Sequence, residues 1–164
     1  MRIRLGLFSL FLAGSSFLFS GEEDFDSKCP SGGDCGSDFV LHEDALRVFV
    51  SFSMPDAALL TFSKSLEETG GTLVFRGIPE NSFQAFAQKI LELKKQGMGA
   101  QVAVDPESFE RLQIKNVPTI CLTFHEGMDK ISGNVSLRYA LSRFSEKGET
   151  RKKARELLQQ LEGF

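Results

Sequence analysis

Apolar residues along the chain fall into clusters of two kinds, and their spacing predicts alternating strands and helices. Continuous runs rich in β-branched and aromatic residues predict buried strands at residues 46–52, 72–75 and 101–105. Between the first two runs, Leu59, Phe62 and Leu66 recur at helical spacing, and Gly70 follows where that helix should stop. The ordered part of the chain is therefore expected to begin with a strand, a helix and a second strand.

Capping residues and glycines indicate where the first two helices begin and end. Ser53 is followed three residues later by Asp56, the pattern of a capping box, so Ser53 is the predicted N-cap of the first helix. Asn81 is the predicted cap of the second helix, which ends at Gly97. The expected inner face of the second helix consists of Phe83, Phe86, Ala87, Ile90 and Leu93.

The second half of the chain changes from single helices between strands to a hairpin and two closing helices. A short helix is expected after Asp105, strands at 119–124 and 130–132 with a turn between them, and helices at 135–146 and 149–161. This order predicts an α/β fold with a mixed sheet of four to five strands, part parallel and part antiparallel, flanked by helices. The pattern leaves open whether 72–75 or 101–105 pairs with the first strand.

The first residues have the pattern of a secretory signal peptide. Arg2 and Arg4 precede an almost wholly apolar run at 5–19, and an acidic stretch follows at once. The run is shorter than the ~20 apolar residues that span a bilayer. Residues 1–20 are therefore predicted to be a cleaved signal that sends the protein to the periplasm.

Residues 21–44 are rich in Gly, Ser, Asp and Glu and predict a flexible tail, so the folded domain is expected over 45–163. Cys29 and Cys35 lie within this tail. In an oxidising compartment two nearby cysteines usually pair, so a small disulfide loop is predicted. A metal site that also uses His42 is the alternative, although its spacing matches no familiar zinc pattern.

Charge and hydropathy exclude two classes of function. The net charge is −3, and loss of the predicted signal leaves 17 basic and 22 acidic side chains. A net acidic chain without a basic stripe is a poor binder of nucleic acid, so no nucleic-acid partner is expected. No later apolar run approaches spanning length, so an integral membrane protein is not expected. No residue pattern indicates a cofactor or a metal.

The order of elements and the segment Val117-Pro118-Thr119 together resemble the thioredoxin superfamily. In that superfamily a cis-proline precedes a core strand and faces the start of the first helix, so the Val117–Pro118 bond is predicted to be cis. Reactive cysteines would lie at Met54 and Ala57, and neither side chain can exchange a disulfide. The resemblance implies a three-layer thioredoxin-like fold with an extra strand–helix unit and without thiol chemistry at this point.

What remains at this point is a predicted groove that binds an extended peptide, because it combines a pliable thioether with backbone groups beside the proline. The groove residues are Ser53, Met54, Pro55, Asp56, Ala57, Arg76, Gly77, Val117, Pro118 and Thr119. Arg76 is expected to be partly buried in a structural ion pair, with Asp105 as a candidate partner; the alternative is a fixed cation that faces an acidic group of a partner protein. No catalytic residue is assigned, and the chain is expected not to be an enzyme.

Five motifs in a common order support a closer resemblance. They are residues 48–55 (VFVSFSMP), Arg76-Gly77, Asp105-Pro106 with Phe109, Ile114 with Val117-Pro118, and 133–137 with 139–141. Together these motifs resemble the F-type TrbC family, whose members are periplasmic pilus assembly factors of type F conjugative transfer (type IV secretion) systems. The resemblance covers residues 46–144 and implies export, pilus assembly and partnership with the periplasmic protein TraW.

The preferred function is therefore a non-enzymatic assembly factor that acts by protein binding. One alternative is a periplasmic thiol oxidoreductase or isomerase that uses Cys29 and Cys35, or Cys121. Cys121 lies mid-strand and is expected to be buried and inert. The other alternative is a general peptide-binding chaperone. His125 is expected in a solvated turn and not at a metal.

Overall fold

A computed structural model describes residues 44–125 and 127–163 of the chain. The predicted signal at 1–20, nearly all of the predicted tail at 21–44, and the predicted Cys29–Cys35 pair lie outside the described residues. The described residues belong to one compact unit. Within them, no helix combines the length and apolarity that crossing a membrane requires.

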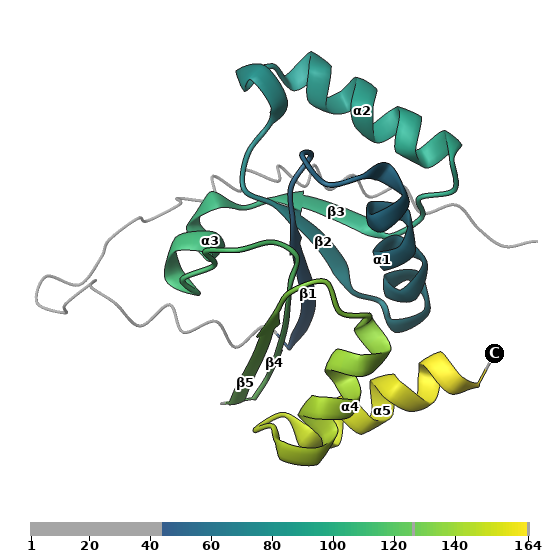
Figure 1. The fold of residues 1–164 in the computed structure, drawn as a ribbon, viewed down its shortest axis with the longest axis vertical. Coiled ribbons are helices and arrows are strands. Elements are labelled where there is room, and N and C mark those ends of the chain that lie inside the picture. The colour runs from purple at the N-terminus through teal and green to yellow at the C-terminus, as the bar shows by residue number, and fades with distance from the viewer. Residues whose placement is uncertain (1–43, 126, 164) are drawn as a thin grey trace, which may run out of the picture. The chain divides into compact units, whose positions relative to one another are not determined.

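A five-stranded mixed sheet forms the centre of this unit, in the order β3-β2-β1-β4-β5 (Figure 1). The strands are β1 (Ala45–Val50), β2 (Thr72–Phe75), β3 (Gln101–Val104), β4 (Thr119–Phe124) and β5 (Gly127–Ser132). The first three are parallel, with β2 between β1 and β3, and β4 runs antiparallel to both β1 and β5. The predicted mixed sheet is confirmed, and the strand that pairs in parallel with β1 is β2.

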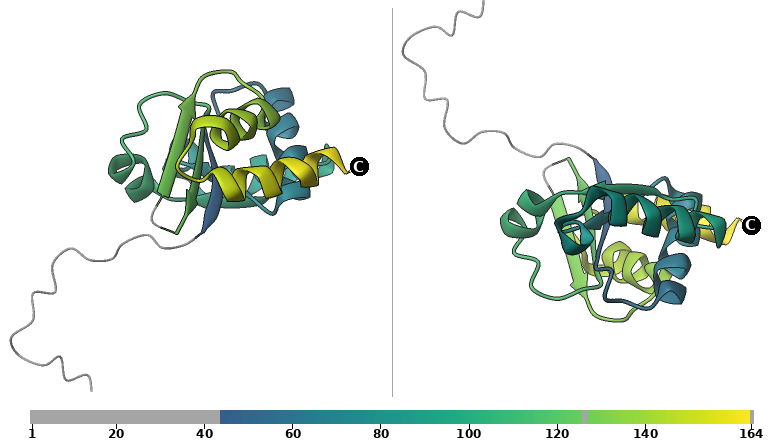
Figure 2. Two further views of the ribbon diagram at one scale, coloured as in Figure 1. Left: turned by 90° about the horizontal axis from the view of Figure 1, so that it is seen from below. Right: turned by 90° about the horizontal axis from the view of Figure 1, so that it is seen from above.

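The helices lie on both faces of the sheet. They are α1 (Asp56–Thr69), α2 (Phe83–Lys95), α3 (Pro106–Arg111), α4 (Leu137–Lys147) and α5 (Arg151–Glu162). The larger core cluster joins β1 residues Val48 and Val50 to α1, α4 and α5, and Figure 2 shows α4 and α5 packed side by side. The alternate β1 residue Phe49 belongs to a smaller cluster with Phe109 of α3. The short α3 therefore covers the face opposite α1, α4 and α5.

Both predicted N-caps of the early helices are wrong by one or two residues. The N-cap of α1 is Pro55, and the Ser53 hydroxyl instead forms a 3.0 Å hydrogen bond with the Ser51 hydroxyl. Ser53 lies two residues before the cap, too early for its side chain to reach the first turn. Ser82, not Asn81, caps α2, because its Oγ accepts the Ala85 N–H at 3.2 Å. Asn81 belongs to a preceding 3-10 turn, Pro79–Asn81.

The predicted inner face of α2 and the predicted second hairpin strand also need correction. Among the expected inner residues of α2 only Leu93 is buried, and Phe83 is 73% exposed. The sequence pattern marks an amphipathic helix but not how much of its apolar side a neighbour covers. Strand β5 begins at Gly127 and not at residue 130, because Gly127 pairs with Phe124 and extends the hairpin ladder.

Candidate functional site

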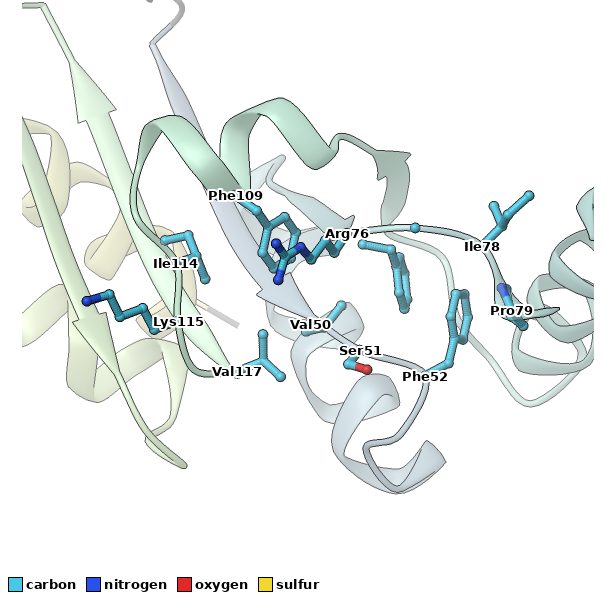
Figure 3. Close-up of a pocket in the computed structure, with 12 residues that line it drawn as sticks. Val50, Ser51, Phe52, Arg76, Ile78, Pro79, Phe109, Ile114, Lys115 and Val117 are labelled. Carbon is cyan, nitrogen blue, oxygen red and sulfur yellow. The ribbon is translucent and has the colours of Figure 1, made fainter. Parts of the chain in front are cut away.

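A pocket of about 360 Å³ opens at the carboxyl ends of β1 and β2, beside the loop between α3 and β4 (Figure 3). Its lining consists of Val50, Ser51, Phe52, Phe75, Arg76, Gly77, Ile78, Pro79, Phe109, Ile114, Lys115 and Val117. The carboxyl ends of parallel strands lie together at this end of the sheet, which is where open α/β sheets commonly bind ligands. The volume is that of a typical binding pocket for a small molecule or a few side chains. We call this site the pocket.

The wall opposite the strands comes from α3 and the loop that follows it. Phe109 packs edge-on against Phe49 of β1, with 4.9 Å between ring centroids, and the Ile114 N–H donates to the Phe109 carbonyl at 2.8 Å. On the far side of the loop, Lys130 Nζ of β5 donates to the Leu112 carbonyl at 2.8 Å. These contacts hold the α3–β4 loop against the sheet, so the pocket has a defined wall.

Asp105 determines where α3 begins. Its carboxylate accepts the Ser108 N–H at 2.9 Å and a hydrogen bond from the Ser108 hydroxyl. Burial alone would raise the pKa of Asp105, but these two hydrogen bonds and the positive charges of Arg111 and Arg47 outweigh it, and the net pKa is lowered. Arg76 forms no ion pair with Asp105, whose carboxylate caps α3, and the Arg76 side chain is exposed. The predicted pair and the predicted partial burial of Arg76 are therefore both wrong.

Four phenylalanines form a continuous series from the pocket to the surface, which we call the aromatic row. Phe52 stacks on Phe75 with 4.0 Å between centroids, and Phe86 of α2 packs edge-on against Phe52 at 5.7 Å. Phe83 then lies 6.2 Å from Phe86 and is largely exposed. The apolar surface of the pocket thus continues onto the start of α2.

Among the described residues, two cations and no carboxylate line the pocket. Arg76 follows β2 and Lys115 lies in the α3–β4 loop, and both side chains are exposed. Neither makes an ion pair or a side-chain hydrogen bond with any described residue. In Figure 3, Arg76 lies among the apolar lining residues, whereas Lys115 extends outward from the loop. The lining of the pocket therefore carries positive charge at Arg76, and Lys115 adds a second cation beside it.

Three of the ten predicted groove residues line the pocket, namely Arg76, Gly77 and Val117. The Val117–Pro118 bond is cis, as predicted. The register that pairs Phe49 with Thr119 brings this segment beside the end of β1, from which the chain leads into α1. The segment around Pro118 and the start of the connection to α1 thus lie at the same end of the sheet.

The other seven predicted groove residues do not line the pocket. Met54 is half-buried against the larger core cluster, and Asp56 forms a 2.9 Å ion pair with Lys89 of α2. Thr119 is fully buried, and its hydroxyl donates to the Asn116 carbonyl at 2.6 Å. Pro118 is buried as well. The remaining residues, Ser53, Pro55 and Ala57, are exposed but are not part of the pocket lining.

The sequence-based prediction missed most of the apolar lining, including Phe52 and Ile78, and it also missed the cation Lys115. Phe109 and Ile114 appeared among the family motifs, but not as site residues. An apolar residue at a strand end looks the same in sequence whether it fills the core or lines a cavity. The signal that could have indicated the site is the position of Arg76 and Ile78 directly after a buried strand.

Cys121 and His125 lie as expected. The Cys121 side chain is 1% exposed, and burial raises the pKa of its thiol although Thr123, Arg47 and Lys130 act in the opposite direction. A buried, protonated thiol is a poor nucleophile. His125 is exposed in the turn after β4, and its backbone N–H donates to Asp44 at 2.8 Å.

Comparison with known proteins gives two matches. A family model described as type-F conjugative transfer system pilin assembly protein matches residues 48–144. The chain is also 32% identical over 110 residues to "Periplasmic protein TrbC" of Escherichia coli (strain K12). That match covers 67% of this chain and 52% of the relative, so the chain spans about half the length of the relative. No solved structure matches the chain.

Proposed function

The chain belongs to the family of type-F conjugative transfer system pilin assembly proteins, and from this membership we propose that it acts in the periplasm as an assembly factor for the transfer pilus. The observation that carries the proposal is the extent of the match. It spans residues 48–144 and therefore contains every residue that lines the pocket. The name of the Escherichia coli relative, a periplasmic protein, supports the same compartment.

We propose further that the chain works by binding another protein and does not catalyse a reaction. The pocket combines apolar rings with exposed cations, and the described residues that line it include no cysteine, histidine or carboxylate. Cys121, the one cysteine among the described residues, is buried with a raised pKa. Apolar cavities with a few charged groups at the mouth are typical of binding sites.

The partner that we propose is the periplasmic protein TraW, which the family resemblance implies. Binding should use the pocket and the surface around Val117, where the chain leaves the α3–β4 loop to enter β4. The thioredoxin-like character of the domain remains part of the same proposal. It is supported by the order of strands and helices and by the position of Val117–Pro118 beside the end of β1.

The test is complementation in a conjugative donor whose own copy of the gene is deleted, with pilus assembly and DNA transfer as readouts. Ile78→Asp places a charge in the pocket, and Leu91→Asp makes the same change on an exposed part of α2 outside it. We expect Ile78→Asp to lower transfer at least about tenfold, the effect of losing about 1.4 kcal/mol of binding free energy. Leu91→Asp should leave transfer unchanged. Full transfer and normal pili in the deletion strain would refute the proposed function.

The thiol alternative is tested in the same strain with Cys121→Ala and with Cys29→Ser combined with Cys35→Ser. A binding protein should retain transfer in both cases, provided that circular dichroism shows the variants folded. Loss of transfer by a folded Cys121→Ala protein would contradict a purely non-enzymatic role. Co-purification of TraW from a periplasmic extract, lost with Ile78→Asp and kept with Leu91→Asp, tests the partner directly.

A further inference from the structure

We propose that the pocket and the aromatic row together bind an extended acidic segment of the partner protein, which inserts one aromatic or large aliphatic side chain into the pocket. The inference rests on the proposed function, because it describes what that function's binding site recognises. Three features carry it: the apolar part of the lining, the exposed end of the aromatic row, and two lining cations that have no partner among the described residues.

The apolar interior selects the inserted side chain. Val50 and Phe75 at the strand ends are almost fully buried, and so is Phe109 on the opposite wall, yet all three line the cavity. The half-buried Phe52, Ile78 and Val117 leave apolar surface accessible in the same lining, and a side chain that enters this space would cover it. Burial of a large apolar side chain is the main source of affinity at protein interfaces, and aromatic residues are the most frequent anchors.

The aromatic row indicates that the occupant is a chain segment and not a single small molecule. Phe83 stands at the outer end of the row with 73% of its surface exposed, and Phe86 connects it to Phe52 in the pocket wall. A ligand confined to the pocket would leave Phe83 in water. An extended segment that passes over the pocket mouth and onto α2 would cover it.

The cations determine the charge of that segment. Arg76 and Lys115 come from two different walls. Among the residues that the structure describes, neither has an acidic partner and no carboxylate lines the pocket. The chain as a whole has a net charge of −3, so this local positive charge stands out against an acidic background. The Arg76 guanidinium in the lining and the Lys115 ammonium beside the pocket complement carboxylates that flank an apolar anchor.

The two kinds of contact have different roles. Exposed ion pairs contribute little net affinity, because water and salt screen them. The inserted apolar side chain should therefore supply most of the binding, and the cations should discriminate acidic from basic sequences. Binding should consequently weaken with added salt but should not vanish.

The test uses three synthetic peptides and the purified protein, with amide chemical shifts recorded by NMR. The first peptide has a phenylalanine between two pairs of glutamates, the second replaces the glutamates by lysines, and the third replaces the phenylalanine by glycine. We expect the first peptide to shift the amides of Gly77, Ile78 and Val117. The other two should bind at least about tenfold more weakly, a difference of about 1.4 kcal/mol.

Paired variants separate charge from shape. Arg76→Glu should weaken binding of the acidic peptide and strengthen binding of the lysine peptide. Lys152→Glu makes the same kind of change at an exposed position of α5 and should alter the binding of neither peptide. Phe83→Ala should weaken binding of the acidic peptide severalfold. Leu91→Ala, another exposed apolar residue of α2 that lies outside the aromatic row, should have no effect.

Equal binding of the acidic and basic peptides, shifts that map away from the pocket, or no binding by any peptide would overturn the inference. These outcomes are distinct from failure of the proposed function. If Ile78→Asp abolishes transfer in donor cells while the acidic peptide does not bind, the assembly role stands and the inference that the pocket recognises an acidic segment is wrong. If the deletion strain transfers DNA normally, the assembly role fails whatever the peptides do.

Discussion

Gly71 lies at the tightest point in the turn between α1 and β2. Gly70 ends α1 in the left-handed conformation, with φ of 72°, and the Gly71 N–H donates to the Leu66 carbonyl at 3.0 Å, as in a Schellman-type helix end. A β-carbon on Gly71 would lie 2.3 Å from Leu66 Cδ2 and 3.0 Å from the Leu46 carbonyl oxygen. A side chain at this position would therefore have to displace the buried Leu66 side chain and would press on the Leu46 carbonyl.

The prediction at this residue is that Gly71→Ala lowers the free energy of unfolding by about 1–3 kcal/mol, the usual cost of overpacking a core. Gly77→Ala is the matched control, because a β-carbon there meets nothing within 4 Å. Its effect should stay within about 0.5 kcal/mol. Urea unfolding followed by circular dichroism measures both. Equal destabilisation by the two substitutions would contradict the predicted clash.

At the scale of single elements, α3 shows how a short helix can form a binding wall. It has only six residues, and its start depends on Asp105, which accepts hydrogen bonds from the Ser108 backbone and side chain. Arg111 closes the same cluster, since its Nη2 donates to Ser108 Oγ at 2.9 Å. Because α3 carries Phe109 into the pocket, loss of this cap should loosen the pocket wall as well as the helix.

Asp105→Ala should lower the free energy of unfolding at neutral pH by about 0.5–2 kcal/mol, as for other N-cap losses, and Asp105→Asn should cost less because asparagine also caps helices. The folded-state pKa of Asp105 is lowered, so the stability that its charge contributes is complete above the unfolded pKa of about 3.9 and is lost as pH falls through the folded value.

The pH dependence gives this prediction a second measurement. The difference in unfolding free energy between the native protein and Asp105→Asn should be constant near neutral pH and should shrink as the solution is acidified below about pH 4. Glu110→Gln, which removes one negative charge from an exposed position of the same helix, is the control for a general charge effect. A difference that grows on acidification would have the wrong sign for a lowered pKa.

At the scale of the whole folded unit, α5 is part of the core although it lies beyond the matched family range, which ends at residue 144. Ala154, Leu157 and Leu161 are buried and belong to the same cluster as β1 and α1. At the start of α5, Asp129 of β5 accepts the backbone N–H groups of Glu149 and Thr150 at 2.9 and 2.7 Å. The helix is thus held at one end by hydrogen bonds and along its length by packing.

Leu157→Ala should therefore lower the free energy of unfolding by about 2–5 kcal/mol, the cost of a cavity in a well-packed core. The exposed neighbour Gln159→Ala should change it by less than about 0.5 kcal/mol. Thermal or urea unfolding monitored by circular dichroism provides the comparison. A Leu157→Ala protein as stable as the native one would show that α5 is not an integral part of the fold.

Much of the fold could be predicted because local patterns carry their own physical cause. The strands at 72–75 and 119–124 match the structure at both ends, since continuous β-branched and aromatic runs are favourable only in a buried strand. The cis bond at Val117–Pro118 and the burial of Cys121 also agree with the sequence-based expectations. The N-cap of α1 could not be predicted from the local pattern, because the Ser53 hydroxyl bonds the Ser51 hydroxyl instead of the helix.

The binding site depended on contacts between segments that are distant in sequence, and these contacts decided what local patterns could not. Apolar periodicity cannot say that β2 lies between β1 and β3, that Phe83 stays in water while Phe86 packs on Phe52, or that Phe109 reaches the ends of two strands. Asp105 caps α3, and among the described residues Arg76 has no counter-ion in the pocket lining. Residue types thus established which elements form, whereas long-range packing established which side chains line the cavity, because burial is a property of the neighbours a residue meets in three dimensions.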